Sequence, residues 1–317
     1  MPRATPPDEA SAAARVHALF ATPVGRVLKA TLFGAFALLA LSLVVRQARA
    51  AVHRISTYRI DATDVAFIDL PSFVDDQMKS GLKAGLSDLW PEEPGRLPSL
   101  YDAGLDRRLR ELLAAHPMIR EIEDVDVRYP SEVRVRATIR APLARFHARV
   151  GADRTAQPIF VDVPLDQEAI VLDAVNYGPM LAKRHMVIVT GVGSICPGVG
   201  HRWSDRLEQV AEGLEAARVA NRLNEELSIP GAPRVEGVDV SAFPAAPKDR
   251  GRGEVVLKLS DGRKVQWGRT ERDLSGVVRE DSYDAKRNRL VDQLEARGTT
   301  DHRDLDVRFP PSARAGS

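Results

Sequence analysis

The chain has a single cysteine, few aromatic side chains and almost no net charge. Of its 317 residues only Cys196 is a cysteine, 5% are aromatic, and the formal net charge is +1. One cysteine excludes an intramolecular disulfide and a zinc ribbon. With a net charge near zero, the chain lacks the excess of basic residues found on protein surfaces that bind nucleic acids. We therefore expect a fold held together by packing alone, with no nucleic acid as a partner.

Sequence motifs for catalysis and cofactor binding are also missing. The seven histidines show no H-x₃-H or H-E-x-x-H spacing, which argues against the common zinc sites. The loop GVGSICPGVG at residues 191–200 has Cys196 where a dinucleotide fingerprint needs its third glycine, and it lacks the Lys-Ser/Thr pair of a P-loop. We interpret this loop as a turn that needs positive φ.

The remaining reactive side chains have ordinary structural explanations. Cys196 and His201 are close in sequence, but no signature of a thiol nucleophile surrounds them. We interpret the thiol as buried or incidental. His116 follows a predicted helix, where a cation meets the negative end of the helix dipole. A cluster of carboxylates is expected on the outward face of a strand: Glu121, Glu123, Asp124 and Asp126. The sequence thus predicts no catalytic residue, no cofactor and no metal, and we do not expect an enzyme.

One long apolar run is present near the N-terminus. Residues 30–45, ATLFGAFALLALSLVV, carry no charge and lie between Lys29 and Arg46. As a helix they span about 24 Å, slightly less than a hydrocarbon core of about 30 Å. Residues 27 and 28 add length, and the flanking basic side chains can reach the headgroups. We therefore predict a transmembrane helix over residues 27–46, after a disordered tail at residues 1–26.

Two other interpretations of the apolar run stay open. A signal peptide is one, because Ala48-Arg49-Ala50 followed by Ala51 is a suitable cleavage site. The long stretch before the run argues against it. A buried helix of a soluble protein is the other, although the run has no polar face. Orientation does not follow from charge, because basic residues flank both ends: Arg15, Arg26 and Lys29 before the run, and Arg46, Arg49, Arg54 and Arg59 after it.

Residues 116–146 hold the clearest pattern in the rest of the chain. Val125, Val127 and Tyr129 alternate with charged residues up to a turn at Pro130-Ser131-Glu132. Alternation resumes on the other side of the turn at Val133, Val135, Ala137 and Ile139. This period of two predicts a half-buried antiparallel hairpin over residues 122–140. An apolar stripe precedes it at Leu105, Leu109, Leu112 and Leu113 and predicts a helix over 104–115, which the His116-Pro117 step ends.

The residues before that helix complete a small domain at 55–145. We predict a strand over 58–70, a helix over 73–89, with Phe73, Met78, Leu82 and Leu86 on one side, and a proline-rich loop over 90–99. The order is then strand, helix, helix, strand, strand. Such an order indicates an α+β unit whose helices cover one face of a small sheet.

A second, mixed and β-rich domain is expected at residues 146–310. Strands are predicted over 159–163, 170–172, 186–190, 235–240 and 304–309, with a hairpin of 255–259 and 265–267 around Asp261-Gly262. Helices are predicted over 204–227, with Ser204 as N-cap, and over 284–297. Tyr177-Gly178-Pro179 is interpreted as a chain break, residues 244–253 as a polar loop, and residues 311–317 as a short tail.

Three separated segments carry a family resemblance. The first joins Leu112-Leu113, His116-Pro117, Val127-Arg128-Tyr129-Pro130 and Ile139-Arg140-Ala141-Pro142, with Ile139 in place of the usual glutamate. The second is LKLSDGRKVQWGR at 257–269, and the third is DLDVRF at 304–309. In this order they resemble the FtsQ/DivIB family of bacterial cell-division proteins, which have a cytoplasmic tail, one membrane helix, a POTRA domain and a β domain.

The resemblance implies a non-catalytic scaffold in the cytoplasmic membrane at the division site, with the N-terminus in the cytoplasm and the later domains in the periplasm. It implies that the POTRA domain and membrane helix contact other membrane division proteins. It also implies that the terminal edge strand binds an FtsB/FtsL-like pair by strand addition. The implied partner-binding residues are Asp306, Arg308, Phe309, Tyr129 and Arg140. Pro310-Pro311 departs from the family pattern and must end strand pairing at Phe309.

Two alternative functions remain at this point. One is a POTRA-bearing component of a secretion or outer-membrane assembly system, although only one POTRA-like unit and no barrel-type strand series is predicted. The other is an exported enzyme that is cleaved after Ala50.

Overall fold

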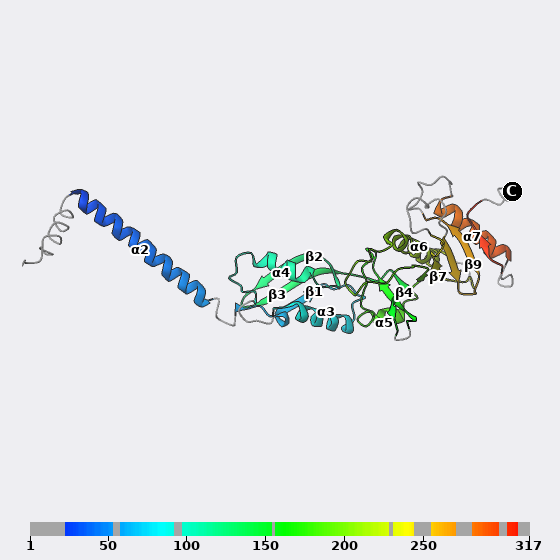
Figure 1. Ribbon diagram of the computed structural model, residues 1–317, viewed down its shortest axis with the longest axis horizontal. Coiled ribbons are helices and arrows are strands. Elements are labelled where there is room, and N and C mark those ends of the chain that lie inside the picture. The colour runs from blue at the N-terminus through cyan, green and yellow to red at the C-terminus, as the bar shows by residue number, and fades with distance from the viewer. Residues whose placement is uncertain are drawn as a thin grey trace, which may run out of the picture. The chain divides into compact units, whose positions relative to one another are not determined.

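The chain folds as an α+β protein with one long N-terminal helix and two β-sheets (Figure 1). The computed structural model describes residues 23–52, 58–91, 97–153, 156–227, 231–243, 255–270, 281–297 and 303–309. The helices are α2 (Pro23–Val52), the 3₁₀ helix η2 (Ala62–Asp64), α3 (Asp76–Leu89), α4 (Leu105–Ala114), α5 (Gly178–Lys183), α6 (Leu207–Glu226) and α7 (Tyr283–Arg297). The strands are β1 (Val65–Ile68), β2 (Ile119–Arg128), β3 (Glu132–Ile139), β4 (Ala144–Ala152), β5 (Pro158–Leu165), β6 (Ile188–Thr190), β7 (Val235–Asp239), β8 (Val255–Leu259), β9 (Lys264–Gly268) and β10 (Leu305–Asp306).

Helix α2 contains one segment that is long and apolar enough to cross a membrane. The segment runs over Lys29–Ala48 and none of it is buried against the described parts of the chain. This exposure contradicts the interpretation as a buried core helix. Helix α2 itself starts before and ends after the predicted span of 27–46, while residues 1–22 of the predicted tail lie outside the described residues.

The smaller sheet has three strands in the order β1-β3-β2, and β1 runs parallel to β3. Its elements follow one another as strand, helix, helix, strand, strand, as predicted. The alternation predicted for β3 is confirmed, since Val133, Val135, Ala137 and Ile139 are all buried. Most of the apolar positions predicted for the two helices are buried as well: Met78, Leu82, Leu86, Leu105, Leu109 and Leu113. Phe73 and Leu112 are only half-buried. The buried side chains form the core beside the small sheet.

Two elements of this region are shorter than predicted. The strand expected over 58–70 is confined to β1, because η2 precedes it and Asp69 adopts a positive φ of 55° directly after it. The helix expected from residue 73 starts at Asp76. The Asp75 carboxylate accepts the N–H of Met78 at 2.9 Å, and this N-cap fixes the first turn.

The larger sheet has seven strands in the order β10-β9-β8-β7-β6-β4-β5. It is mixed, with parallel pairs β4/β6, β6/β7 and β9/β10 and antiparallel pairs elsewhere. Helix α6 connects the parallel strands β6 and β7, and α7 connects β9 and β10, as parallel pairing requires. The hairpin predicted around Asp261-Gly262 is confirmed by β8 and β9. The core includes Phe146, Trp203, Leu257 and Trp267.

Several expectations for this region are wrong. Strand β4 was not predicted, and residues 170–172 form only isolated bridges, with Leu165 and Arg202 as partners. Tyr177-Gly178-Pro179 starts helix α5, because proline suits the first helical turn. Ser204 is not the N-cap of α6. Arg206 stands there in the left-handed conformation without a side-chain cap.

By contacts within the chain, residues group into two compact units. One comprises residues 1–61, 91–105 and 127–132, and the other comprises 62–90, 106–126 and 133–317. The chain passes from the small to the large sheet between Ile139 and Ala144, next to the predicted domain boundary at 145/146. The predicted division into domains at 55–145 and 146–310 stays a prediction. The loop at 244–253 and the residues from 310 onwards lie outside the described residues.

Candidate partner-binding surfaces

The C-terminal strand β10 lies at one edge of the seven-stranded sheet. The sequence predicts a partner-binding edge strand in this segment. It pairs with β9 in the register Leu305↔Val265 and Asp306↔Gln266. Val307 continues the pairing by donating its N–H to the Gln266 carbonyl at 3.2 Å. The strand itself comprises only Leu305–Asp306 and is shorter than the predicted 304–309. Its end is a local turn in which the Asp306 carboxylate accepts the N–H and the guanidinium of Arg308.

Helix α7 already occupies part of this edge. Because Val307 faces β9, the carbonyl of Asp306 faces the other way, and it accepts a hydrogen bond from Gln293 at 2.9 Å. Arg289 donates to the carbonyl of Val307 at 2.5 Å. A partner strand at β10 therefore meets side chains of α7 at this edge. Arg308 lies 5.9 Å from the ring centre of Phe309, so the three predicted residues 306, 308 and 309 form one small surface.

Tyr129 belongs to a cluster of tyrosines in the other unit. It exposes 71% of its surface at the tip of the β2–β3 hairpin. Its ring centre is 5.8 Å from that of Tyr58, and Tyr58 makes an edge contact with Tyr101 at 5.2 Å. The neighbouring Tyr129 raises the pKa of Tyr58. Exposed tyrosines of this kind are common in protein interfaces. Sequence reasoning selected Tyr129 but missed its two neighbours, which come from distant segments.

Arg140, the fifth predicted residue, is engaged inside the protein. Its guanidinium lies 2.5 Å from the Asp166 carboxylate and 2.8 Å from that of Glu168. Its backbone carbonyl accepts the Tyr177 hydroxyl at 2.7 Å. Glu168 also pairs with Arg120 of β2 at 2.7 Å, and hydrogen bonds from Arg140 and Arg120 lower the pKa of Glu168. This cluster fastens the small sheet to the loop that follows β5.

Strand β5 forms the opposite edge of the large sheet and was not predicted as an interaction surface. The Pro164 carbonyl accepts the Leu172 N–H at 2.9 Å on the side away from β4. By alternation, the backbone groups of Phe160 and Asp162 line the same open side. Ile159, Phe160 and Val161 expose 42%, 48% and 39% of their surfaces. An apolar edge strand of this kind invites pairing with another chain. The Ile-Phe-Val triplet between two prolines was the signal in the sequence.

The histidine and the glycine-rich loop have structural roles. His116 is 2% exposed and its Nδ1 accepts the Met118 N–H at 3.1 Å, while burial lowers the pKa of His116. The predicted cationic role at a helix end is therefore wrong. In the glycine-rich loop Gly191 has a φ of +94°, as predicted. Ser194 accepts the Trp203 indole N–H at 2.9 Å, which ties the loop to the core.

Cys196 is expected to be nearly inert toward alkylation in the folded protein. Burial raises the pKa of Cys196 from 9.0 to about 11, so the thiolate forms only at a pH above the ordinary range. At pH 8 a thiol with a pKa of about 11 has a thiolate fraction about 100-fold lower than a thiol with a pKa of 9.0. Iodoacetamide labelling of the full chain should be slower by about this factor before unfolding in urea than after it. Labelling rates within roughly threefold of each other would contradict the burial of the thiol.

Among the described residues, no group of three or more His, Cys, Asp or Glu side chains is arranged to hold a metal ion. A comparison with protein-family models gives no match for the chain. A comparison with curated proteins likewise gives no match.

Proposed function

We propose that the protein is a single-pass membrane scaffold of the bacterial cell-division complex and that it works without catalysis or cofactor. The order of the parts carries this proposal. An apolar helix comes first, then a strand-helix-helix-strand-strand unit with its strands in the order β1-β3-β2, then a mixed sheet whose last strand lies at an edge. This order matches the membrane helix, POTRA domain and β domain of the resembled family. We therefore assign a POTRA-like fold to residues 55–145.

In this proposal α2 stays in the cytoplasmic membrane as an anchor. Lys29–Ala48 is 20 residues long, the length that spans a hydrocarbon core of about 30 Å. The resemblance assigns the N-terminus to the cytoplasm and the two sheets to the periplasm. N-terminal sequencing of the mature protein tests the anchor, because a chain that begins at Ala51 would mean that the helix is a cleaved signal peptide.

We propose that the surface of Asp306, Arg308 and Phe309 docks an FtsB/FtsL-like pair. Gln293 already binds the outward carbonyl of Asp306, so most of the binding energy is expected from side chains rather than from a long backbone ladder. Aromatic and arginine side chains dominate interfaces of this kind. The tyrosine cluster of Tyr58, Tyr101 and Tyr129 is proposed as a second surface, for other membrane division proteins. Arg140 is left out, because its guanidinium is held by Asp166 and Glu168.

Changing Phe309 to aspartate is expected to lower co-purification of the partner pair by at least about tenfold, since an interface aromatic contributes about 2 kcal/mol. The tagged full chain is purified from growing cells with each variant, and the small membrane partners are quantified by mass spectrometry. Val175→Asp is the control, because Val175 exposes 70% of its surface and belongs to none of the candidate surfaces. Equal recovery of the pair with Phe309→Asp and with the unchanged chain would contradict docking at the terminal strand.

A further inference from the structure

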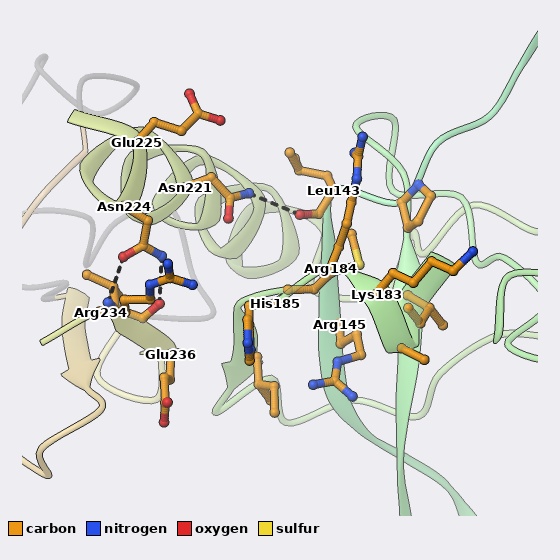
Figure 2. A pocket seen from close by; sticks show the side chains of 16 residues that line it. Leu143, Arg145, Lys183, Arg184, His185, Asn221, Asn224, Glu225, Arg234 and Glu236 are labelled. Carbon is orange, nitrogen blue, oxygen red and sulfur yellow. Dashed lines mark hydrogen bonds between the residues drawn. The ribbon is translucent and has the colours of Figure 1, made fainter. Parts of the chain in front are cut away.

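An open cleft lies where the three parallel strands of the large sheet begin. Its volume is about 1090 Å³, and it is lined by the start of β4, the connection from α5 to β6, the later half of α6 and the start of β7. Figure 2 shows Arg145 and Arg184 on one side of the cleft and Arg234 on the other. This cleft shares no lining residue with the end of β10, the tyrosine cluster or the β5 edge.

The walls of the cleft are fixed by two asparagines of α6. Strand β6 pairs with its neighbours only from Ile188 onwards, which leaves the starts of β4 and β7 without a strand between them. Asn221 donates to the Leu143 carbonyl at 3.2 Å. Asn224 bonds both the carbonyl and the N–H of Val235, at 2.9 and 2.8 Å. These three backbone groups are therefore already bonded, so they are not available to a ligand, and side chains around them would recognise it.

Among the described residues, basic side chains outnumber acidic ones around the cleft. Four basic side chains line it, namely Arg145, Lys183, Arg184 and Arg234, with two acidic ones, Glu225 and Glu236. The difference of four and two leaves two positive charges. Within the described part of the chain none of the four cations forms an ion pair. Arg145 Nε is buried there without a hydrogen-bond partner. A buried donor that lacks a partner is unfavourable, and an anionic ligand would accept its hydrogen bond.

We infer that this cleft binds an extended acidic segment of a partner polypeptide. Arginine guanidinium groups bind carboxylates with paired, charge-assisted hydrogen bonds. The cations come from three separate segments on two sides of the cleft, so one small anion cannot meet them all. A chain with carboxylates at several positions can. The inference is independent of the proposed division role and of the Phe309 surface.

The test uses the full chain in detergent micelles and a fluorescein-labelled oligoglutamate peptide, with binding followed by fluorescence anisotropy. The double variant Arg184→Gln/Arg234→Gln is expected to bind the peptide at least tenfold more weakly. Both side chains are exposed, so the fold should be kept, and urea unfolding of the variant checks this. The matched control is Arg149→Gln/Arg202→Gln, which removes the same charge from exposed positions outside the cleft and should leave the affinity within twofold.

Four outcomes would overturn the inference. The first is that the unchanged chain does not bind the peptide, and the second is that both double variants lose binding equally. The third is that the unchanged chain binds inorganic pyrophosphate more tightly than the peptide. The fourth is that Arg184→Gln/Arg234→Gln loses binding to phosphatidylglycerol vesicles but still binds the peptide. The second would mean unspecific attraction, the third a small-anion site, and the fourth a lipid site. Phe309→Asp should leave peptide binding unchanged, which separates failure here from failure of the terminal-strand proposal.

Discussion

Replacing Arg140 with alanine is expected to lower the free energy of unfolding by about 3–5 kcal/mol. The Asp166 side chain is only 2% exposed, and Arg140 lies 2.5 Å from its carboxylate. Without the guanidinium a carboxylate is left buried without its cation, which is costly in a medium of low polarity. The N–H groups of Glu168 and Ile170 still bind this carboxylate, so the loss should not exceed this range.

Urea unfolding of the full chain in detergent micelles measures this change, followed by the fluorescence of the buried Trp203 and Trp267. Arg136→Ala is the matched control, because Arg136 pairs with Asp69 at the surface and such pairs contribute about 0–1 kcal/mol. The double variant Arg140→Ala/Asp166→Asn should recover part of the loss, since no buried charge remains. A change in the free energy of unfolding below about 1 kcal/mol for Arg140→Ala would show that the ion pair with Asp166 contributes no more than a surface pair does.

A second large effect is expected at the glycine-rich loop, where Gly191→Ala should destabilise the fold by about 3 kcal/mol or more. Gly191 has a φ of +94°, a conformation that disfavours residues with a Cβ atom. A Cβ atom here would also lie 2.3 Å from the backbone nitrogen of Ser241, so backbone must move. The Gly191 carbonyl shares the Gln209 amide with the carbonyl of Val240, so movement of this loop would disturb a buried hydrogen-bond network.

Gly262→Ala separates the two causes. Gly262 has a φ of +86° but nothing within 4 Å of the added Cβ position. Only the conformational cost remains there, about 1 kcal/mol. The same urea measurement applies to both variants. If Gly191→Ala and Gly262→Ala destabilise equally, the close approach of Ser241 has no energetic consequence and the loop is less rigid than its contacts indicate.

Elements with a strong apolar period were predictable from the sequence. The alternation at Val133, Val135, Ala137 and Ile139 gave β3 because large side chains mark the buried face. Helix α6 and the β8–β9 hairpin were predicted for the same reason. Strand β4 was missed because two of its buried positions are the alanines Ala144 and Ala148, whose small side chains do not stand out from the polar residues between them. Helix α5 was missed because a Gly-Pro step is typical of turns as well as of helix starts.

The candidate surfaces were only partly predictable. Asp306, Arg308 and Phe309 are neighbours in sequence, so their proximity followed directly. The role of Arg140 did not, because Asp166 and Glu168 lie far along the chain. The cations of the cleft come from β4, from the end of α5 and the residue after it, and from the residue before β7. The strand order β7-β6-β4 brings these segments together. Such sites depend on tertiary packing and have no local signal.

The most direct test of the central claim is the localisation of a fluorescently tagged full chain in growing cells. The proposed scaffold of the division complex predicts a ring at the septum that appears as cells begin to constrict and disappears after separation. An even distribution around the cell envelope throughout the cycle would contradict the division role.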